Sequence, residues 1–295
     1  GICGLLSFRC LHPNLNKTGA AIVHLLIPVT QRYPFLISVP HGGTEVPGSI
    51  RPLLLLSDED LRFYCDPRTR IIFGYQDRVA AYIDTPVSRM VVDLNRPPLP
   101  LPPRDPDGII KTMTIDGREV YRPGQVPDMP LIHNLLVAHY FPYHQRIDEL
   151  IDRNRIRMAF DCHSMLPAGS GNQKDAGKVR PLICLGNNGD RQGRARKGSI
   201  ATCSGEWIAA LAGVFEEEFP QKNAVALNNP FSGGFIANAH FWHKGVPWVQ
   251  VEVNRALYEP SPSSGGHDDD AQERATALRE KIWKVLTGFW DRVRD

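Results

Sequence analysis

The chain has 295 residues and a mass of 33.0 kDa, enough for one large α/β domain or two smaller ones. Hydrophobic residues make up 42% and charged residues 22%, which excludes a disordered, collagen-like or coiled-coil protein. The 34 Lys and Arg residues against 32 Asp and Glu residues leave a net charge of +2, so we expect no nucleic-acid partner. No apolar run reaches the roughly 18 residues of a membrane span, so no membrane partner is expected either.

The N-terminal apolar run at residues 20–29 is interrupted by His24 and Pro28, and no small-residue cleavage site follows it. We expect a packed segment or strand here rather than a signal peptide. The six cysteines are scattered without a CxxC pair, a usage typical of a reducing compartment, so the prediction is a cytoplasmic protein. Cys162 stands beside His163 but is expected to point into the core, because neighbouring strand residues face opposite sides.

Five short apolar runs predict β-strands, and each ends in a loop dense in polar residues and glycine. These runs are residues 35–39, 89–93, 158–161, 181–185 and 248–253. Apolar spacing near 3.6 predicts helices over residues 131–155, 204–219 and 268–294, with a short helix over 57–64. Strands that alternate with helices predict a mostly parallel sheet covered on both faces, with its ligand at the carboxyl ends of the strands.

Residues 97–130 break this alternation with a Pro-rich stretch and a predicted hairpin that turns at Asp116-Gly117. We interpret them as an insertion near the site, within a single domain over residues 1–295 that carries an N-terminal extension over 1–33. The basic stretch 191–197 and the acidic start of the last helix, 268–270, are interpreted as solvated surface rather than as ligand sites.

Two histidines directly follow predicted strands and are candidate metal ligands. His41 stands in Pro-His-Gly-Gly, where the glycines leave the ring uncrowded, and His163 follows Asp161, which could orient its imidazole. An ordinary turn histidine is the alternative for each. A nearby acid would complete a three-ligand site with an open position, and both Glu45, in the same loop as His41, and Asp66, after the short helix, could supply it.

Glu252 lies within an apolar strand, where an unpaired ionised carboxylate would be costly to bury. Burial beside a metal would suit it to move a proton, although a structural ion pair is the alternative. Arg96 and Arg255 each follow an Asn at a strand end and could bind the carboxylates of an acidic substrate, or could form structural ion pairs. His144 and His240 could support a ligand or contact the substrate, although core or surface histidines are expected at both positions.

Six segments in the same order resemble the N-formylglutamate amidohydrolase family, from about residue 35 to residue 258. They are Ser38-Val-Pro-His-Gly-Gly43, Val92-Asp-Leu-Asn-Arg96, Tyr143-His144, Asp161-Cys-His-Ser-Met165, Asn229-Pro-Phe-Ser-Gly-Gly-Phe235 and Val249-Gln-Val-Glu-Val-Asn-Arg-Ala-Leu-Tyr258. The resemblance implies a three-layer αβα sandwich like that of the zinc exopeptidases, and hydrolysis of a linear amide bond. The implied substrate is N-formyl-L-glutamate, cleaved to L-glutamate and formate in a late step of histidine breakdown.

More distant resemblances sharpen the expected roles. Aspartoacylases carry a similar Asp-Leu-Asn-Arg whose last two residues hold the substrate, which implies this role for Asn95 and Arg96. Zinc-dependent cell-wall amidases carry a similar His-Gly-Gly loop with the acidic ligand well downstream, which implies Asp66 rather than Glu45. The chain departs from carboxypeptidases, which place a Glu where Thr44 stands.

The resulting hypothesis is a hydrolase with one zinc ion per chain. His41, Asp66 and His163 hold the metal, Glu252 transfers the proton, and Asn95, Arg96 and Arg255 bind a small acidic N-acyl amino acid. Two alternatives stay open at this point. One is a hydrolase of another N-acyl amino acid or small peptide amide, and the other is a binding protein that keeps the fold without catalysis.

Overall fold

The computed structural model describes residues 32–171, 173–260 and 268–294. The predicted segment at residues 20–29, nearly all of the predicted extension over 1–33, and Cys3 and Cys10 lie outside the described residues. Within them no helix combines the length and apolarity needed to cross a membrane.

A mixed sheet forms the middle layer. Its strands in the described residues are β1 (Tyr33–Val39), β2 (Val79–Asp84), β3 (Met158–Met165), β4 (Ile183–Gly186), β5 (Val225–Leu227) and β6 (Trp248–Asn254). They lie in the order β2-β1-β3-β6-β4-β5. Strands β2, β1, β3 and β6 are mutually parallel, β4 is antiparallel to β6, and β5 is parallel to β4. The predicted mostly parallel mixed sheet is confirmed.

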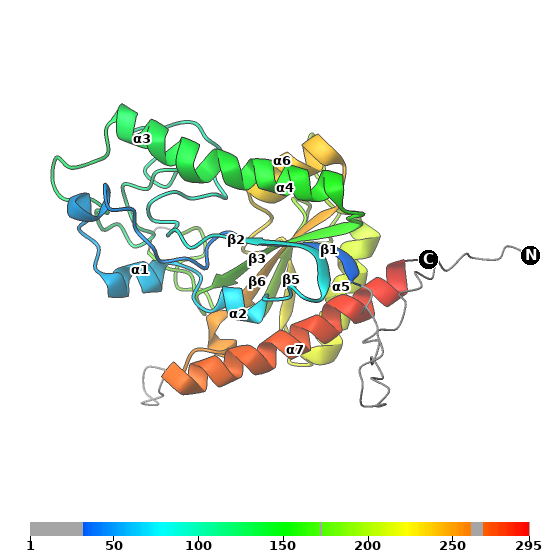
Figure 1. The fold of residues 1–295 in the computed structure, drawn as a ribbon. Helices are drawn as coiled ribbons and strands as arrows, with labels where there is room; N and C mark the ends of the chain where they lie inside the picture. Colours follow the sequence, from blue (N-terminus) through cyan, green and yellow to red (C-terminus); the bar gives the residue numbers. More distant parts are fainter. Residues whose placement is uncertain (1–31, 172, 261–267, 295) are drawn as a thin grey trace, which may run out of the picture. The chain divides into compact units, whose positions relative to one another are not determined.

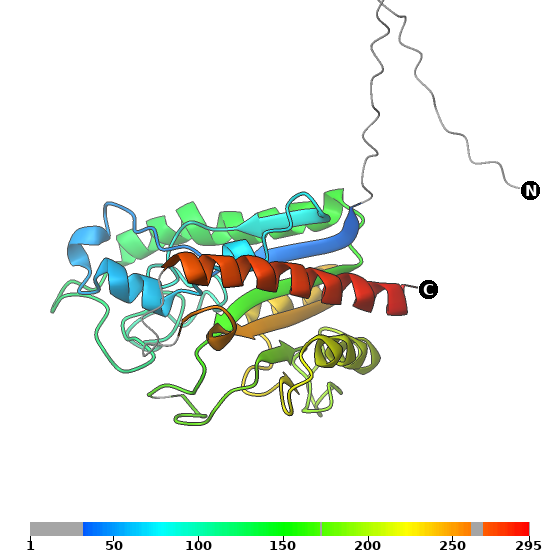
Figure 2. The ribbon, with the colours of Figure 1, turned by 90° about the horizontal axis from the view of Figure 1, so that it is seen from below.

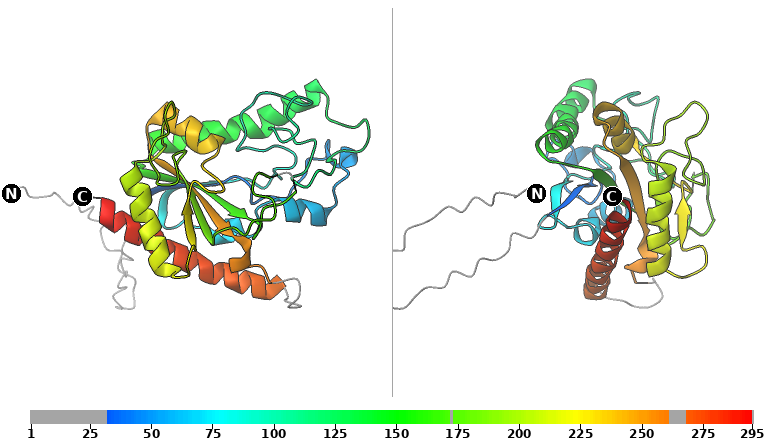
Figure 3. Two further views of the ribbon diagram at one scale, coloured as in Figure 1. Left: turned by 180° about the vertical axis from the view of Figure 1, so that it is seen from behind. Right: turned by 90° about the vertical axis from the view of Figure 1, so that its right-hand side faces the viewer.

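Helices cover both faces of the sheet, which confirms the three-layer αβα sandwich (Figure 1). On one face lie α3 (Met129–Leu135), a π-helical turn (Leu136–Tyr140), α4 (Phe141–Arg153) and α6 (Phe235–Lys244). The other face carries α2 (Thr69–Ile72), α5 (Gly205–Glu218) and α7 (Asp268–Val293). Seen from below, α7 runs across the sheet (Figure 2), and α5 lies beside it (Figure 3). A short helix, α1 (Asp58–Tyr64), and 3-10 turns at Arg51–Leu53 and Arg255–Leu257 complete the described elements.

Alternation along β3 separates an apolar face from a polar one. Phe160 and Cys162 join the core cluster beneath α5 and α7, so the prediction that Cys162 points into the core is confirmed. Asp161 and His163 point to the opposite face, toward α4 and α6. There Ser38 of β1 donates to Asp161 Oδ1 over 3.2 Å. The carboxyl ends of β1, β3 and β6 therefore bring polar side chains together on the α4 and α6 face.

The strand predicted over residues 89–93 is wrong. The strand of this region is β2, and Val91 and Val92 both donate their amide hydrogens to Ser88 O, within a turn. The run is apolar because Val91 and Val92 are buried beneath the loop, and a short buried turn has the same composition as a short buried strand. The predicted hairpin at Asp116-Gly117 is a turn closed by a single bridge between Met113 and Glu119.

The predicted helices form with small changes at their ends. The continuous helix expected over 131–155 contains the π-helical turn, and α2, α6 and β5 are short elements that the periodicity does not indicate. Cys65, Cys162, Cys184 and Cys203 are buried free thiols.

Candidate active site

His41 is placed by a tight turn directly after β1. A side chain on Gly43 would put its Cβ 2.3 Å from the carbonyl oxygen of Pro86, so only glycine lets the turn pack against this backbone. The amide of Asp66, just beyond the end of α1, donates to His41 O over 2.8 Å. The loop after β1 and the residue after α1 are thus joined through the backbone, which brings their side chains to one point.

His41, Asp66 and His163 form a buried cluster whose ligand atoms all lie within 4.8 Å of one another. Asp66 Oδ2 lies 3.1 Å from His163 Nδ1 and 3.6 Å from His41 Nδ1. The two imidazole rings are 4.7 Å apart between centroids. The structure therefore brings the three predicted ligands together, whereas Glu45, the alternative acid, is exposed and outside the cluster.

Each imidazole is held from behind by a second carboxylate. His41 Nε2 donates to Asp93 Oδ1 over 2.7 Å, and His163 Nε2 lies 2.9 Å from Asp161 Oδ2. Because a carboxylate oxygen only accepts, the hydrogen of each ring is fixed on Nε2 and Nδ1 is left with a lone pair facing Asp66. This carboxylate–histidine arrangement is typical of metal ligands.

The cluster fits a cation. His41 Nδ1 is buried and has no hydrogen-bond partner in the described residues. Burial tends to raise the pKa of Asp66, but the neighbouring His163 and His41 outweigh it and hold that pKa below its usual value. Burial tends to lower the pKa of His163, yet Asp161 raises it well above its usual value. A metal ion would compete with a proton for this ring, because an imidazole binds a metal through an unprotonated nitrogen.

Glu252 lies beside His163 in the sheet, since the two are partners in the β3–β6 register. Burial raises the pKa of Glu252 to about 7, while His163 opposes the shift. Gln250 Nε2 donates to Glu252 Oε1 over 2.7 Å and fixes the carboxylate. A carboxyl group whose pKa lies near neutrality can both accept and release a proton at that pH.

The predicted substrate-binding residues are held in different ways. Arg96 donates from Nη2 to Asp107 Oδ2 over 2.8 Å, and its side chain is 35% exposed. Arg255 is buried and donates to the backbone carbonyls of Phe63 and Cys65, at the end of α1. Its Nε has no partner in the described residues. Arg96 therefore has the more accessible guanidinium.

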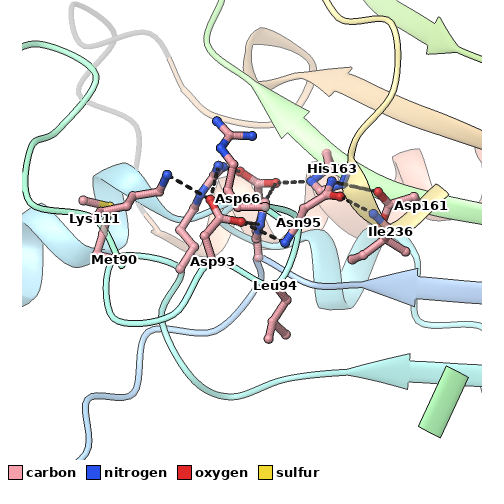
Figure 4. Close-up of polar contacts among 12 residues, drawn as sticks. Asp66, Met90, Asp93, Leu94, Asn95, Lys111, Asp161, His163 and Ile236 are labelled. Carbon is pink, nitrogen blue, oxygen red and sulfur yellow. Dashed lines mark hydrogen bonds and ion pairs between the residues drawn. The ribbon is translucent and has the colours of Figure 1, made fainter. Parts of the chain in front are cut away.

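Asn95 lies between the two carboxylates that orient the histidines (Figure 4). Its Nδ2 donates to Asp161 Oδ2 over 2.9 Å, and its Oδ1 accepts from the amide of Ile236 over 2.8 Å. Both ends of this amide are thus taken by the protein. The structure places Asn95 as a support for Asp161 and for the first turn of α6.

Two further cationic side chains lie at the site. Arg89 Nη2 donates to Asp93 Oδ2 over 2.9 Å, and its Nη1 lies 3.6 Å from Asp66 Oδ1. Lys111 Nζ lies 3.0 Å from Asp93 Oδ2, and Figure 4 marks this ion pair with a dashed line. Arg89 lies in the run that predicts a strand, and Lys111 lies in the predicted hairpin of the 97–130 insertion, so no pattern marks either residue.

A cavity of about 550 Å³ opens over the cluster. His41, Asp66, His163 and Glu252 line one side, and residues of the 97–130 stretch line another, among them Asp107 and Lys111. The cationic side chains of its wall are Arg89, Arg96, Lys111, Arg180 and Arg255. The cavity suits a small ligand with negative charge.

Comparison with known proteins gives consistent matches along the chain. A family model described as N-formylglutamate amidohydrolase matches residues 33–259. The N-formylglutamate deformylase of Pseudomonas aeruginosa is 27% identical over 277 residues, covering 89% of this chain and 96% of that protein. The Pseudomonas putida protein of the same name is 27% identical over 271 residues, covering 86% and 93%.

A solved structure has the same fold. The N-formylglutamate amidohydrolase from Ralstonia eutropha JMP134 superposes with a TM-score of 0.64 at 20% sequence identity, covering 88% of this chain and 96% of that one. The segment matched by the family model contains all the candidate site residues, from His41 to Arg255.

Proposed function

The chain belongs to the N-formylglutamate amidohydrolase family, whose members hydrolyse an amide bond, and from this premise we propose that it releases formate from N-formyl-L-glutamate with one bound zinc ion. The observation that carries the proposal is the pair of buried histidines whose Nε2 atoms are fixed by Asp93 and Asp161 and whose Nδ1 atoms face Asp66. Two imidazoles and one carboxylate form the ligand set of many catalytic zinc sites with an open position.

His41, Asp66 and His163 would hold the metal. When bound, it would supply Lewis acidity, which lowers the pKa of a water molecule and polarises the formyl carbonyl. Asp93 and Asp161 keep the histidines in the tautomer that offers Nδ1, and the short contact between Asn95 and Asp161 fixes the second of these carboxylates. The chain thus provides a rigid ligand set before any substrate arrives.

Glu252 is the proposed proton carrier. Its carboxylate accepts the proton of the attacking water and returns it to the amine of the departing glutamate. The burial that raises its pKa to about 7 matches this double task, because accepting and releasing a proton need comparable populations of both forms. Gln250 keeps the carboxylate facing the cavity through its 2.7 Å hydrogen bond.

The carboxylates of the substrate are proposed to bind to Arg96 and Arg255, and Asn95 supports the part of the cavity wall that contains these residues. Arg96 is half-buried in the cavity wall and offers a planar guanidinium suited to a carboxylate. Arg89 lies closest to the ligand cluster, 3.6 Å from Asp66, and adds positive charge where an oxyanion would develop.

The wider setting follows from the substrate. Hydrolysis of N-formyl-L-glutamate is a late step of histidine breakdown, and we infer a cytoplasmic location. Buried free thiols at Cys65, Cys162, Cys184 and Cys203 support a reducing compartment.

The direct test measures the metal content of the purified protein and its formate release from N-formyl-L-glutamate, with and without a chelator. We expect about one zinc per chain, loss of activity on chelation, and recovery on adding zinc back. Substitution Asp66→Asn should abolish metal binding, whereas Glu45→Gln, at the exposed alternative acid, should leave it unchanged. Equal losses in the two variants would contradict the assigned ligand set.

A second measurement defines the acyl group. N-acetyl- and N-succinyl-L-glutamate and an N-formyl dipeptide are compared with N-formyl-L-glutamate at equal concentration. We expect the formyl amino acid to have the highest kcat/KM. A metal-loaded protein that releases no formate but cleaves another member of the panel would keep the hydrolase site and replace the proposed substrate.

A further inference from the structure

A second histidine pair lies behind the site, between α4 and α6. His144 Nδ1 and His240 Nε2 are 2.9 Å apart, and the planes of the two rings are nearly parallel, at 18° to each other. His144 Nε2 faces Leu94 O over 3.1 Å, and His240 Nδ1 faces Asp148 Oδ1 over 2.8 Å. Nothing in the proposed reaction uses these groups, although Tyr143-His144 is one of the segments that carry the family resemblance.

The three contacts require one proton each. A carbonyl oxygen only accepts, so His144 Nε2 carries a hydrogen and donates to Leu94 O. The contact between His144 and His240 needs a second hydrogen, and the contact between His240 and Asp148 needs a third. Burial lowers the pKa of His240, while the hydrogen bond with Asp148 opposes that shift.

The distribution of these protons follows from burial. Burial, followed by the neighbouring His240, lowers the pKa of His144 to about 4, so His144 is neutral at neutral pH. With its hydrogen on Nε2, its Nδ1 accepts from His240 Nε2. His243 contacts the other oxygen of Asp148 from the exposed side, 3.0 Å away.

The acceptor at the inner end, Leu94 O, belongs to the loop that orients the metal ligands. Leu94 stands between Asp93, which holds His41, and Asn95, which holds Asp161 behind His163. The carbonyl oxygen of Leu94 instead faces His144 on α4. Tyr140, one helical turn before His144, donates from its hydroxyl to Arg96 O over 2.9 Å. Two side chains on one helix face thus hold alternate carbonyls of this loop.

Helix α6 also contacts the 93–96 loop directly, through its first turn. The amide of Ile236, in its first turn, donates to Asn95 Oδ1 over 2.8 Å, and His240 follows one turn later. Hydrogen bonds therefore join the loop to α4, α4 to α6, and α6 back to the loop. A shift of the loop would have to break several of them together.

We propose that His144 is a positioning residue, which fixes the 93–96 loop through Leu94 O, with His240 and Asp148 holding its ring, and thereby sets the geometry of the metal-ligand histidines. The inference rests on the proposed function in that it takes His41 and His163 as ligands. It adds that the affinity for the metal depends on a side chain that touches neither the metal nor the substrate.

The test compares His144→Leu with His144→Gln. Leucine removes both hydrogen bonds but fills the space beside Tyr140 and Phe235, whereas glutamine can donate to Leu94 O and accept from His240. His243→Asn is the matched control, because His243 contacts Asp148 from the exposed side and does not reach the loop. Zinc affinity is measured by chelator competition, and amide hydrogen exchange is measured on the metal-free protein.

We expect His144→Leu to weaken zinc binding about tenfold, the lower end of the effect of removing a partner of a ligand. Exchange of the loop amides 93–96 should become about fivefold faster, as the loss of one hydrogen bond predicts. His144→Gln should recover most of both properties, and His243→Asn should match the wild type.

Unchanged zinc affinity and unchanged exchange in His144→Leu would overturn the proposal. Equal losses in the Leu and Gln variants would also overturn it, since the ring would then act only by packing. The exchange measurement needs neither metal nor substrate. A wild-type protein that releases no formate would therefore refute the proposed function. The exchange rates of the loop amides 93–96 in the His144 variants would still decide this inference.

Discussion

Gly234 should tolerate no side chain, and its replacement by alanine tests whether Asn95 supports the residues of the site. A Cβ at this position would lie 2.2 Å from Asn95 Nδ2 and 2.3 Å from its Oδ1. Gly234 has φ −109° and ψ −176°, an extended conformation open to any residue, so the effect of Gly234→Ala is steric and not a matter of backbone strain. We expect the substitution to push Asn95 out of its place.

The size of the effect follows from the bonds that Asn95 makes. Its displacement breaks the 2.8 Å bond from Ile236, worth about 1 kcal/mol, and the charge-assisted 2.9 Å bond to Asp161, worth about 2 kcal/mol. Gly234→Ala should therefore lower the free energy of unfolding by about 3 kcal/mol. Because Asp161 holds His163, zinc affinity should fall as well, by at least about tenfold.

Denaturant unfolding of the metal-free protein and chelator competition for zinc measure the two effects. Gly213→Ala is the control, since Gly213 lies within α5 and an added Cβ there meets nothing within 4 Å. It should stabilise the protein by about 0.5 to 1 kcal/mol, because alanine favours a helix more than glycine does. A Gly234→Ala variant as stable as the wild type, with unchanged zinc affinity, would show that Asn95 keeps its place and does not support His163.

Three further predictions concern single side chains. Glu252→Gln should lower kcat at least about a hundredfold while bound zinc is retained, and a kcat near that of the wild type would exclude Glu252 as the proton carrier. Arg96→Ala should raise KM about tenfold for N-formyl-L-glutamate but little for N-formyl-L-methionine, whereas equal increases would argue against a carboxylate contact. Because the pKa of His144 falls from its ordinary 6.5 to about 4 on folding, the unfolded chain binds more protons between these values. The stability of the metal-free protein should thus decrease by about 3 kcal/mol as the pH falls through this window, and His144→Gln should lack this component of the acid titration.

Strands that are buried on both faces of the sheet could be predicted, because this burial alone gives them a continuous apolar composition. β1, β3, β4 and β6 appear in the sequence as short apolar runs. His41 and Arg255 follow β1 and β6, and His163 lies near the carboxyl end of β3. Parallel strands share one carboxyl edge, so the meeting of His41 and His163 could be expected. The run at residues 89–93 shows the limit of this reasoning, because burial of Val91 and Val92 in a turn leaves the same pattern.

Local sequence is sufficient to predict the alternation of strands and helices, the two histidines near strand ends and the burial of Glu252, since each depends on neighbours in the chain. The folded structure is needed to establish which acid lies beside the histidines, what Asn95 contacts and where Arg89, Lys111 and His144 lie. These outcomes depend on contacts between segments far apart in the chain, such as Asp66 with His163 and His144 with Leu94. Such contacts leave no periodic pattern, because each is fixed by the packing of whole elements and not by the spacing of residues along one of them.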